Sequence, residues 1–439
     1  MTEAVSAAVP APKTTPYAAF RSRDYSIFWI SALVSNSGTW MQTITVPYVI
    51  FQLTHSTTWV GFTAFMAFGP ALFVGPLAGS LADRFPRKTV VLVTQLIMML
   101  AAFALYGFWV SGIATPWNIV VILGISGTAS GISIAAWQSF VPQLVPPEDM
   151  VSAIRLNSMQ FTAARAFGPA LAGIVLAELG PATAFLCNAV SFLLVAAALL
   201  AIHPRSIVLA AGNTPFVQHF RAGLAYVRER RALVLAVLTV TMLSFFGSSL
   251  VQLSAPLAHD VFDVGKAEYG LLVAFFGAGA LVGSFVTLAY GDRVRRSRMA
   301  LSGLVGFSAG EVLLGAAPTF VIGLAGLTVM GLSYLLVAVS LNTSIQARVD
   351  EGHRGRVLSI YLMGLLAGVP LGALLAGAVA ESVGLRATVI GGGVLLLAFT
   401  AFAFSVFHRL TPLDETLEET ERVRTDALLT NQPAIAGVD

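Results

Sequence analysis

Charged side chains are scarce in this 439-residue sequence, because Asp, Glu, Lys and Arg together make up only 11% of it. Soluble domains carry about 25% charged residues, whereas 56% of the side chains here are hydrophobic. So little polar surface cannot cover a water-soluble globule of this size, and the high hydrophobicity argues against disorder. The shortage of charge therefore predicts a membrane protein.

Cysteine and the common catalytic motifs are also scarce. The single Cys187 cannot form an internal disulfide, and the six histidines fall in expected loops or helix ends without the spacing of metal ligands. The only Gly-Lys pair, Gly265-Lys266, is followed by Ala267, so no nucleotide-binding G-x-x-x-x-G-K-[ST] motif is present. No G-x-S-x-G elbow lies within a soluble fold. We therefore expect no metal, no cofactor and no enzymatic activity.

Long apolar segments are what the sequence has in abundance. Each is close to the roughly 20 residues that a transmembrane helix requires, and none resembles the shorter alternating strands of a membrane β-barrel. Only Arg155, Arg165 and Glu311 place an Asp, Glu, Lys or Arg inside them. We predict an all-α membrane protein with twelve transmembrane helices. The expected spans are Ser26–Phe51, Val60–Ala82, Thr89–Val110, Trp117–Trp137, Ser152–Ala177, Ala182–Ile202, Ala232–Leu257, Tyr269–Tyr290, Met299–Ala317, Phe320–Ser340, Val357–Ala380 and Ala387–Phe407.

The second half of the chain repeats the plan of the first. Gly127, Gln143 and Gly180 recur as Gly331, Gln346 and Gly384, at an offset that stays near 204 residues. Such a repeat predicts two pseudo-symmetric six-helix halves, an architecture found among transporters. The expected divisions are a cytoplasmic tail (1–25), an N-terminal six-helix bundle (26–202), a cytoplasmic linker (203–231), a C-terminal six-helix bundle (232–408) and a cytoplasmic, disordered tail (409–439).

Basic residues are distributed unevenly between the two sets of loops. Fifteen Lys and Arg residues fall in loops on one side and only two, Lys266 and Arg386, on the other. Because cytoplasmic loops carry the positive excess, we predict a multi-pass protein of the cell membrane with both termini in the cytoplasm. The first 24 residues lack the features of a signal peptide. The net charge of only +3 indicates no nucleic-acid partner.

The linker carries one amphipathic stretch. Phe216, Phe220, Leu224 and Val227 fall on one helical stripe, and arginines surround it. This pattern predicts an interfacial helix that contacts the anionic headgroups of the lipid bilayer.

One loop motif carries a family resemblance. The run Gly79–Lys88 resembles G-x-L-A-D-R-x-G-R-[KR], the loop 2–3 signature of the major facilitator superfamily, with Pro86 where the family usually has Gly. The stretches 36–42, 142–149 and 164–169 further resemble the twelve-helix bacterial exporter branch that includes the enterobactin exporter. The resemblance covers about residues 20–410.

This resemblance implies a function as well as the major facilitator fold. It implies a secondary active transporter that works by alternating access, as a monomer and proton-coupled antiporter for efflux of small amphipathic solutes such as drug-like molecules or siderophores. A lipid flippase or a non-transporting membrane protein on the same fold remains the alternative, and a channel or an intramembrane enzyme is disfavoured.

The motif residues have a role in the family, which is to hold the two halves together at the cytoplasmic side. A carboxylate beside basic residues accepts charge-assisted hydrogen bonds, and such contacts exist only when that side closes. The alternative is a simple topological anchor of positive charge. The residues of this conformational latch are Gly79, Asp83, Arg84, Arg87 and Lys88, and the second-half copy is Asp292, Arg293, Arg295 and Arg296.

Small residues spaced by four occur in the second, fifth, eighth and eleventh spans, which form the interface between the halves in this superfamily. Small residues let helix backbones approach closely, although general helix packing would give the same pattern. The expected interface positions are Gly75, Gly168, Pro169, Gly279, Gly283, Gly368 and Gly372.

Five residues are candidates for binding or gating. Arg165 lies deep in the fifth span, where an arginine needs a partner; that partner is either an anionic solute or a structural tie. Helices 1, 4, 7 and 10 line the family's cavity, which here offers Asn36, Gln42, Gln252 and Tyr334 among aromatic neighbours. This inventory favours an amphipathic or lipophilic solute.

Glu311 is the only mid-span carboxyl and thus a possible proton carrier, although the ninth helix is peripheral in the family. An interhelix hydrogen bond is the alternative role.

Overall fold

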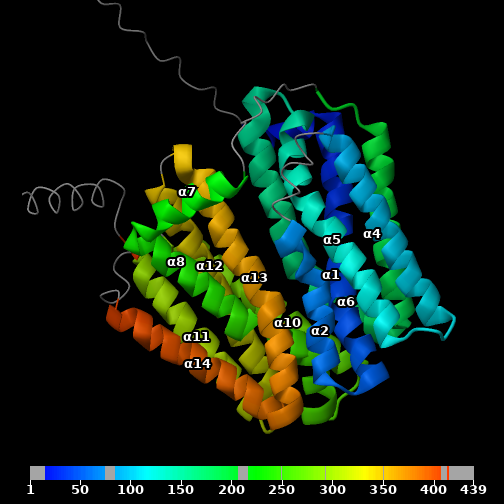
Figure 1. Cartoon of the computed structure of the whole chain (residues 1–439), viewed down its shortest axis with the longest axis vertical. Coiled ribbons are helices and arrows are strands. Elements are labelled where there is room, and N and C mark those ends of the chain that lie inside the picture. The colour runs from blue at the N-terminus through cyan, green and yellow to red at the C-terminus, as the bar shows by residue number, and fades with distance from the viewer. Residues whose placement is uncertain are drawn as a thin grey trace, which may run out of the picture.

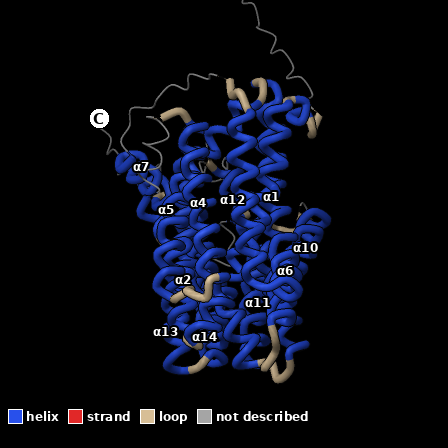
Figure 2. Tube along the Cα trace, turned by 90° about the vertical axis from the view of Figure 1, so that its right-hand side faces the viewer, coloured by secondary structure: helices blue, strands red, loops and turns tan. Residues whose placement is uncertain are grey.

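The computed structural model describes residues 15–74, 85–205, 216–248, 250–291, 293–349, 351–406 and 413–414, and these residues form helices joined by short loops without a strand (Figures 1 and 2). The membrane-length helices are α1 (Arg23–Thr54), α2 (Thr57–Phe68, with helical residues on to Val74), α4 (Arg87–Val110), α5 (Pro116–Phe140), α6 (Met150–Ala201), α10 (Lys266–Tyr290), α11 (Arg296–Ala316), α12 (Phe320–Arg348), α13 (Glu351–Val383) and α14 (Leu385–Val406). The linker contains α7 (Phe216–Arg228).

The seventh expected span is built from several pieces. It begins as α8 (Arg231–Met242) and passes through the π-helical turn η4 (Leu243–Ser248), the 3-10 turn η5 (Leu250–Leu253) and the short α9 (Ser254–Pro256). It ends in a second π-helical turn, η6 (Leu257–Val261). Irregular turns of this kind change which residues share a face of the helix.

Local sequence signals explain where several helices begin. The Ser22 hydroxyl accepts a hydrogen bond from the Tyr25 N–H at the start of α1, and Ser56 does the same for α2 through the Trp59 N–H. Thr115 and Asn118 form a reciprocal capping box at the start of α5. These side chains satisfy amide groups that the helix itself leaves without partners.

Two glycines in the left-handed backbone region divide the last helix pair of each half. Gly180, with φ 79°, separates the two parts of α6, and Gly384, with φ 91°, separates α13 from α14. A residue with a Cβ would be strained at such an angle. The two joints are equivalent positions of the internal repeat, 204 residues apart.

The helices stand side by side in two groups, α1 to α6 and α8 to α14 (Figure 1). We call the end that carries Arg23, Arg87, Arg231 and Arg296 the basic end. The opposite end, which carries Glu381 and Lys266, is called the sealed end for reasons given below. The described helices of the two groups meet towards the sealed end and diverge towards the basic end, beside α7 (Figure 1).

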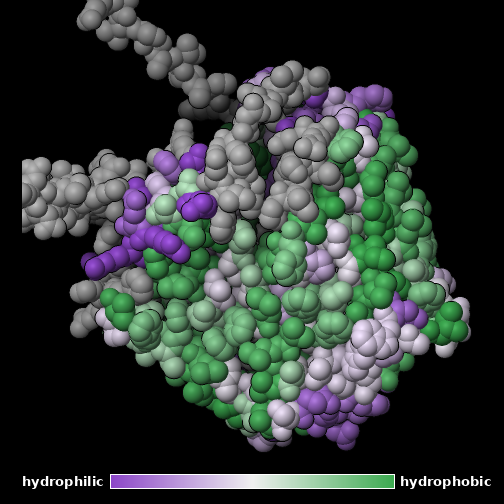
Figure 3. All heavy atoms as spheres, in the orientation of Figure 1, coloured by the Kyte–Doolittle hydropathy of each residue, from purple (hydrophilic) through white to green (hydrophobic). Residues whose placement is uncertain are grey.

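The outer surface of the bundle is apolar. Leu100, Val121, Phe285 and Leu288 have exposed fractions of 62%, 56%, 69% and 83%. Hydrophobic residues cover most of the middle of the face shown in Figure 3, and hydrophilic residues gather towards the ends. Among the described residues, ten helices are long and apolar enough to cross a membrane. With α1 and the first part of α6, they correspond to the twelve expected spans, and the predicted fold class is confirmed.

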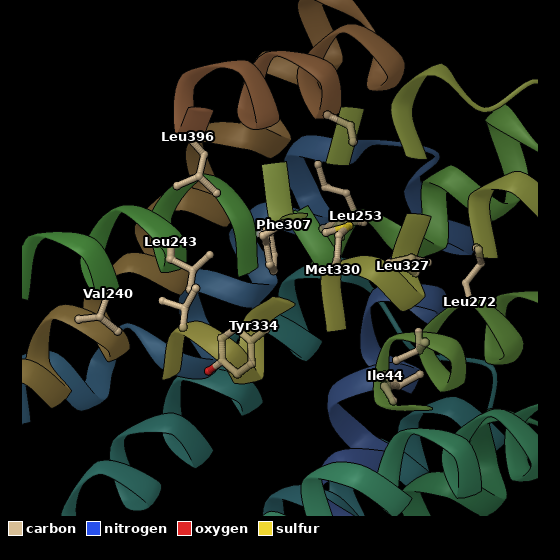
Figure 4. Close-up of a cluster of buried hydrophobic side chains, with 14 of the residues drawn as sticks. Ile44, Val240, Leu243, Leu253, Leu272, Phe307, Leu327, Met330, Tyr334 and Leu396 are labelled. Carbon is tan, nitrogen blue, oxygen red and sulfur yellow. The ribbon is translucent and has the colours of Figure 1, made fainter. Parts of the chain in front are cut away.

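The C-terminal group has a densely packed interior. Leu243, Phe307, Met330 and Tyr334 belong to one buried apolar cluster and lie close together in Figure 4. The linker helix α7 joins this group, because the Tyr226 ring stacks on the His353 ring of α13 at 4.4 Å between centroids, while the Arg230 guanidinium lies 3.4 Å from the centroid of the Tyr226 ring.

Candidate functional site

Backbones of the two groups touch at the sealed end. A Cβ on Gly61 of α2 would lie 2.3 Å from the carbonyl oxygen of Ala373 in α13, and a Cβ on Gly377 would lie 2.4 Å from that of Thr57. Gly173 of α6 and Gly270 of α10 are equally close, since a Cβ on Gly173 would lie 2.7 Å from the Gly270 Cα. Contacts this tight require glycine and hold the two groups together without intervening side chains.

A carboxylate joins the groups beside these glycines. One oxygen of Glu381, near the end of α13, accepts hydrogen bonds from the backbone N–H groups of Thr57 and Thr58 at 2.9 and 3.2 Å. The hydroxyls of Ser56 and Thr57 donate to the same oxygen at 3.0 and 2.9 Å. A negative charge at the start of α2 is also favoured by the helix dipole. We call this set of contacts the Glu381 clasp.

A third contact lies between the first and eighth spans. The Tyr269 hydroxyl donates to the Ile44 carbonyl at 2.7 Å, and the Tyr48 and Tyr269 rings stack with centroids 5.7 Å apart. These three sets of contacts all lie in the half of the bundle nearer Glu381, which is why this end is called sealed.

The glycines predicted to lie between the halves make other contacts in this conformation. A Cβ on Gly168 would meet Trp40, one on Gly279 or Gly283 would meet α12, and one on Gly368 would meet Ser244, so all four approach helices of their own group. The i, i+4 spacing marks a face that permits close approach, but it does not say which helix approaches. Gly75 and the side chain of Pro169 lie outside the described part of the structure, and no close contact is described for Gly372.

Two connected chambers open within the N-terminal group. The first, which we call the central chamber, has a cavity volume of about 90 Å³. Its lining residues come from α1, α2, α4, α5 and α6, together with Gln252 of the C-terminal group. The polar lining residues are Thr39, Gln42, Thr43, Thr63, Ser126, Ser130, Asn188 and Gln252.

The second chamber, which we call the side chamber, has a cavity volume of about 120 Å³ and shares Thr39, Met98, Ser130 and Phe192 with the first. All of its lining residues belong to α1, α4, α5 and α6. The remaining ones are Ser35, Asn36, Gln95, Ser133, Ile134, Trp137, Gln138 and Phe161.

The described walls of both chambers combine apolar side chains with uncharged polar ones. None of their lining residues is Asp, Glu, Lys, Arg or His. The Asn188 amide donates to the Gln42 side-chain oxygen at 2.7 Å, and the Ser191 hydroxyl lies 3.3 Å from the Asn188 side-chain oxygen. Such walls offer hydrogen bonds and apolar contact to a small molecule, without a fixed charge to neutralise.

The structure brings together some of the predicted binding residues and separates others. Asn36 lines the side chamber, and Gln42 and Gln252 line the central chamber. Tyr334 is instead 8% exposed and packed in the apolar cluster of the C-terminal group, with its ring 6.3 Å from that of Phe276 (Figure 4).

Three amide residues that line the chambers were not predicted. Gln95 lies in α4, Gln138 near the end of α5 and Asn188 in the second part of α6. The family resemblance predicts that the cavity-lining residues lie on the first, fourth, seventh and tenth spans. The sequence did contain a feature that could have identified two of these lining residues. Gln95 and Asn188 are amide side chains that interrupt long apolar runs.

The ionisable candidates give a mixed outcome. Arg165 lies on α6, but its side chain is outside what the structure describes. Glu311 is 0% exposed, and neither of its carboxyl oxygens has a hydrogen-bond partner among the described residues. Its Cβ faces α14, where a Cβ on Gly393 would lie 3.0 Å away. The interhelix hydrogen bond considered for Glu311 is therefore not made by these residues.

Part of the predicted latch can be placed. Gly79, Asp83, Arg84 and Asp292 lie outside the described residues. The Arg87 guanidinium donates to the Ser139 carbonyl at 3.5 Å and the Lys88 amine to the Ile202 carbonyl at 2.7 Å, both within the N-terminal group. In the second-half copy, Arg293 and Arg295 are exposed and Arg296 begins α11.

Comparison with known proteins identifies the family to which this chain belongs. The sequence profile of a family described as a transmembrane secretion effector, within the major facilitator superfamily, matches residues 14–432. An uncharacterised transporter of this superfamily from Bacillus subtilis, YfiS, is 28% identical over 84% of this chain and 89% of its own length. The staphyloferrin A transporter of Staphylococcus aureus is 23% identical over 87% and 96%, and the enterobactin exporter EntS of Escherichia coli is 24% identical over 76% and 80%.

Solved structures share the fold. A bacterial homologue of the human lysosomal transporter Spinster, in an inward-facing and unoccupied conformation, has a TM-score of 0.70 and 16% identity over 90% of this chain and 99% of its own. The xylose transporter XylE of Escherichia coli, in an inward-open conformation, has a TM-score of 0.67 and 13% identity over 90% and 99%. The chain is a multi-pass membrane protein that belongs to the transmembrane secretion effector family of major facilitator superfamily transporters.

Proposed function

We propose that this protein is a secondary active transporter that exports small amphipathic solutes by alternating access. The observation that carries the proposal is the arrangement of the two groups, which meet at the sealed end and diverge at the basic end beside two uncharged, hydrogen-bonding chambers. This is the arrangement expected of a carrier that is open to one side only. The amphipathic character of the chamber walls supports a solute with both apolar and polar parts.

The direction of transport follows from charge and from the relatives. Cytoplasmic loops carry the excess of Lys and Arg, so we assign the basic end to the cytoplasm and the sealed end to the outside. The solute would then enter from the cytoplasm. Export is supported by the relative named as an enterobactin exporter, and a siderophore as solute by that protein and by the staphyloferrin A transporter.

The transport cycle requires the sealed end to open and the basic end to close. Opening would break the Glu381 clasp. An exposed negative charge at a helix N-terminus stabilises the helix by about 0.3–1 kcal/mol, so this contact costs little to break. Closing would form new contacts at the basic end, where we assign the latch to Asp83 with Arg84, Arg87 and Lys88. In this conformation Arg87 and Lys88 hold their own group together instead.

Glycine substitutions test alternating access directly. Gly61→Leu would force α2 away from α13, because a Cβ there already lies 2.3 Å from the Ala373 carbonyl. Gly107→Leu is the matched control, since no heavy atom lies within 4 Å of a Cβ at that position. We expect Gly61→Leu to abolish transport at unchanged membrane abundance, while Gly107→Leu keeps it.

Cysteine labelling distinguishes opening from unfolding. In a Cys187→Ser background, a cysteine placed by Thr63→Cys in the central chamber should react poorly with a membrane-impermeant reagent added from the outside. Gly61→Leu should increase that reactivity several-fold. Equal reactivity with and without Gly61→Leu would show that the Gly61 contact does not seal the chamber.

Solute flux tests the proposal as a whole. Inside-out membrane vesicles containing the protein should accumulate amphipathic drugs or siderophores when their interior is acidified, whereas vesicles without the protein should not. Dissipating the pH gradient should stop accumulation if protons drive it. Ion conductance would instead indicate a channel, movement of lipid between leaflets a flippase, and none of these activities a non-transporting protein.

Proton coupling has no carrier among the chamber residues that the structure describes. Glu311 is the mid-span carboxyl, yet it is fully buried and lines neither chamber. Taking up and releasing a proton there would require α11 and α14 to separate. Arg165 remains our candidate for gating or for contact with an anionic part of the solute, because its backbone lies one helical turn beyond Phe161, which lines the side chamber.

A further inference from the structure

A pocket of about 440 Å³ lies at the sealed end and shares no lining residue with either chamber. We call it the outer pocket. Both groups contribute to its walls, since Phe51 and Trp109 come from the ends of α1 and α4, whereas His259 and Lys266 belong to η6 and α10. Ligand pockets in proteins typically have volumes of about 300–1,000 Å³. The outer pocket is therefore large enough for a small molecule that contacts both groups at once.

Aromatic rings form much of this lining. The Tyr48 and Tyr269 rings are stacked across the two groups with an interplanar angle of 15°. The rings of Phe51, His55 and His259 form a triangle whose centroids lie 5.6–5.8 Å apart. Rings in such arrangements present faces and edges that pack against a further aromatic ring. The lining thus favours an aromatic ligand over an aliphatic one of the same size.

Lys266 gives the outer pocket a positive charge. It is an exposed lining residue, and its amine forms no ion pair or hydrogen bond with another described residue. None of the described lining residues is Asp or Glu. The Asp260 carboxylate lies 2.8 Å from Nδ1 of His259 and does not line the pocket. Because a lysine amine donates charge-assisted hydrogen bonds to an anion, the pocket favours a negatively charged group beside its rings.

A second pocket at the same end has the opposite character. It measures about 570 Å³, shares His55 with the outer pocket and is lined by Asp260 and Glu381. Its Arg386 guanidinium already donates to two backbone carbonyls at 2.9 and 2.7 Å. The two carboxylates repel an anion. A small aromatic anion that reaches the sealed end is therefore expected to bind in the outer pocket rather than in this one.

We propose that the outer pocket binds an aromatic carboxylate or sulfonate from outside the cell and thereby slows export. The anionic group pairs with Lys266, and the ring packs among Phe51, Trp109 and Tyr269. A ligand that contacts both groups stabilises the sealed conformation, because opening the sealed end separates the walls of the pocket. The effect on export rests on the proposed function and on the assignment of the sealed end to the outside. Binding itself can be measured without transport.

Three matched probes separate charge from aromatic contact. The full chain, purified in phosphatidylcholine nanodiscs, is titrated by calorimetry with 2-naphthalenesulfonate, the neutral 2-naphthalenesulfonamide and decahydro-2-naphthalenesulfonate. We expect the naphthalenesulfonate to bind at least fivefold more tightly than the other two, because the sulfonamide lacks the charge and the decahydro compound lacks the rings. The sulfonamide partitions best into lipid, so partition would give a different order. Equal affinity for all three probes would overturn the proposal.

Two variants locate the site. Lys266→Gln should weaken binding of naphthalenesulfonate at least fivefold and should abolish its preference over the sulfonamide. The control is Arg298→Gln, which removes an exposed cation at the basic end that lines neither the outer pocket nor a chamber, and it should leave the affinity unchanged. Unchanged affinity in Lys266→Gln would place the anion elsewhere and refute the assignment.

Gly61→Leu tests whether binding requires the sealed conformation. This variant forces the two groups apart at the sealed end, so it should lose most of the naphthalenesulfonate binding, whereas Gly107→Leu should keep it. Unaltered helical circular dichroism shows that each variant is folded. Equal affinity in the two folded variants would show that the ligand does not bridge the groups.

The effect on export is measured in inside-out vesicles, in which the proposed orientation places the outer pocket in the lumen. Naphthalenesulfonate loaded into the lumen should slow solute accumulation several-fold in the unaltered protein but not in Lys266→Gln, and the sulfonamide should have no effect. Binding in nanodiscs combined with unchanged accumulation would refute the inhibition. Binding by a protein that shows no solute flux at all would refute the proposed function while leaving the outer pocket in place as a site.

Discussion

The N-terminal and C-terminal groups share a backbone plan but differ in their interiors. Equivalent joints lie at Gly180 and Gly384, yet the two described chambers, with their amides and hydroxyls, lie in the N-terminal group. Tyr334 of the C-terminal group is instead packed in an apolar cluster that also extends into the N-terminal group. Of the described chamber residues, only Gln252 comes from the C-terminal group. In the proposed function, the N-terminal group would supply most of the hydrogen bonds to the solute.

The first helices of the two groups show how this difference arises. α1 is a continuous helix of 32 residues whose Asn36, Thr39 and Gln42 all face the chambers. Its counterpart is interrupted by the π-helical turn η4 and the turns after it. In that region Ser244 is 0% exposed, and its hydroxyl has no hydrogen-bond partner among the described residues. A duplicated backbone can therefore keep its joints while only one copy keeps a polar face towards a cavity.

Tyr334→Ala is expected to have the largest effect on stability. The side chain is buried in the C-terminal cluster, so its removal leaves a cavity that costs about 3–5 kcal/mol, as for other large aromatic residues. The variant should show a much lower unfolding temperature in detergent and reduced membrane abundance. Normal stability combined with lost transport would instead make Tyr334 a solute contact, and the contrast between the two groups would disappear.

Among folded variants of the chamber residues, Gln42→Leu should have the largest effect on transport. It removes a chamber amide and the hydrogen bond that the Asn188 amide donates to it. We expect at least a tenfold fall in flux per molecule. The unfolding temperature should fall modestly, because the fully buried Asn188 amide loses its acceptor at a cost of about 1–3 kcal/mol.

Ser244→Ala is the matched control for Gln42→Leu in the C-terminal group. Its hydroxyl is already without a described partner, so transport and stability should stay at their original levels. If Ser244→Ala reduced flux as much as Gln42→Leu, both groups would contribute to binding.

The sequence predicts the helices better than it predicts their contacts. Span positions follow from apolar length alone, and the joints at Gly180 and Gly384 follow from the repeat. The contacts of Gly61, Gly173, Gly270 and Gly377 across the groups were not predicted, because small residues permit close approach to any neighbouring helix. Which neighbour is met depends on how the groups are tilted in this conformation, and no local pattern encodes that tilt.

The chamber residues were predicted in part for a related reason. Asn36 and Gln42 lie on a helix where the family places its cavity, whereas Tyr334 lies on another such helix and is buried in the core. Gln95 and Asn188 lie on helices outside the set that lines the cavity in the family. A polar amide within an apolar span was a physical signal for both, since a leucine there would avoid the cost of desolvation.

Gln252→Leu should have a smaller effect than Gln42→Leu. Gln252 reaches the central chamber from the C-terminal group, where it faces a wall that already supplies hydroxyl and amide groups. We expect a two- to threefold rise in the solute concentration for half-maximal transport and little change in the maximal rate. A loss as large as that of Gln42→Leu would show that the solute is shared between the groups.

Glu311→Leu should have the smallest effect on transport. The carboxyl is fully buried against α14 and lines neither chamber, and its oxygens have no hydrogen-bond partner among the described residues. Replacing an unpartnered buried polar group with an apolar one of similar size is neutral or stabilising. We therefore expect an unchanged or higher unfolding temperature. Flux driven by a pH gradient should be the same as in the unaltered protein. Suppose instead that flux with the pH gradient fell to the level seen without it, while solute still bound. Glu311 would then be the proton carrier, and the C-terminal group would take part in proton coupling.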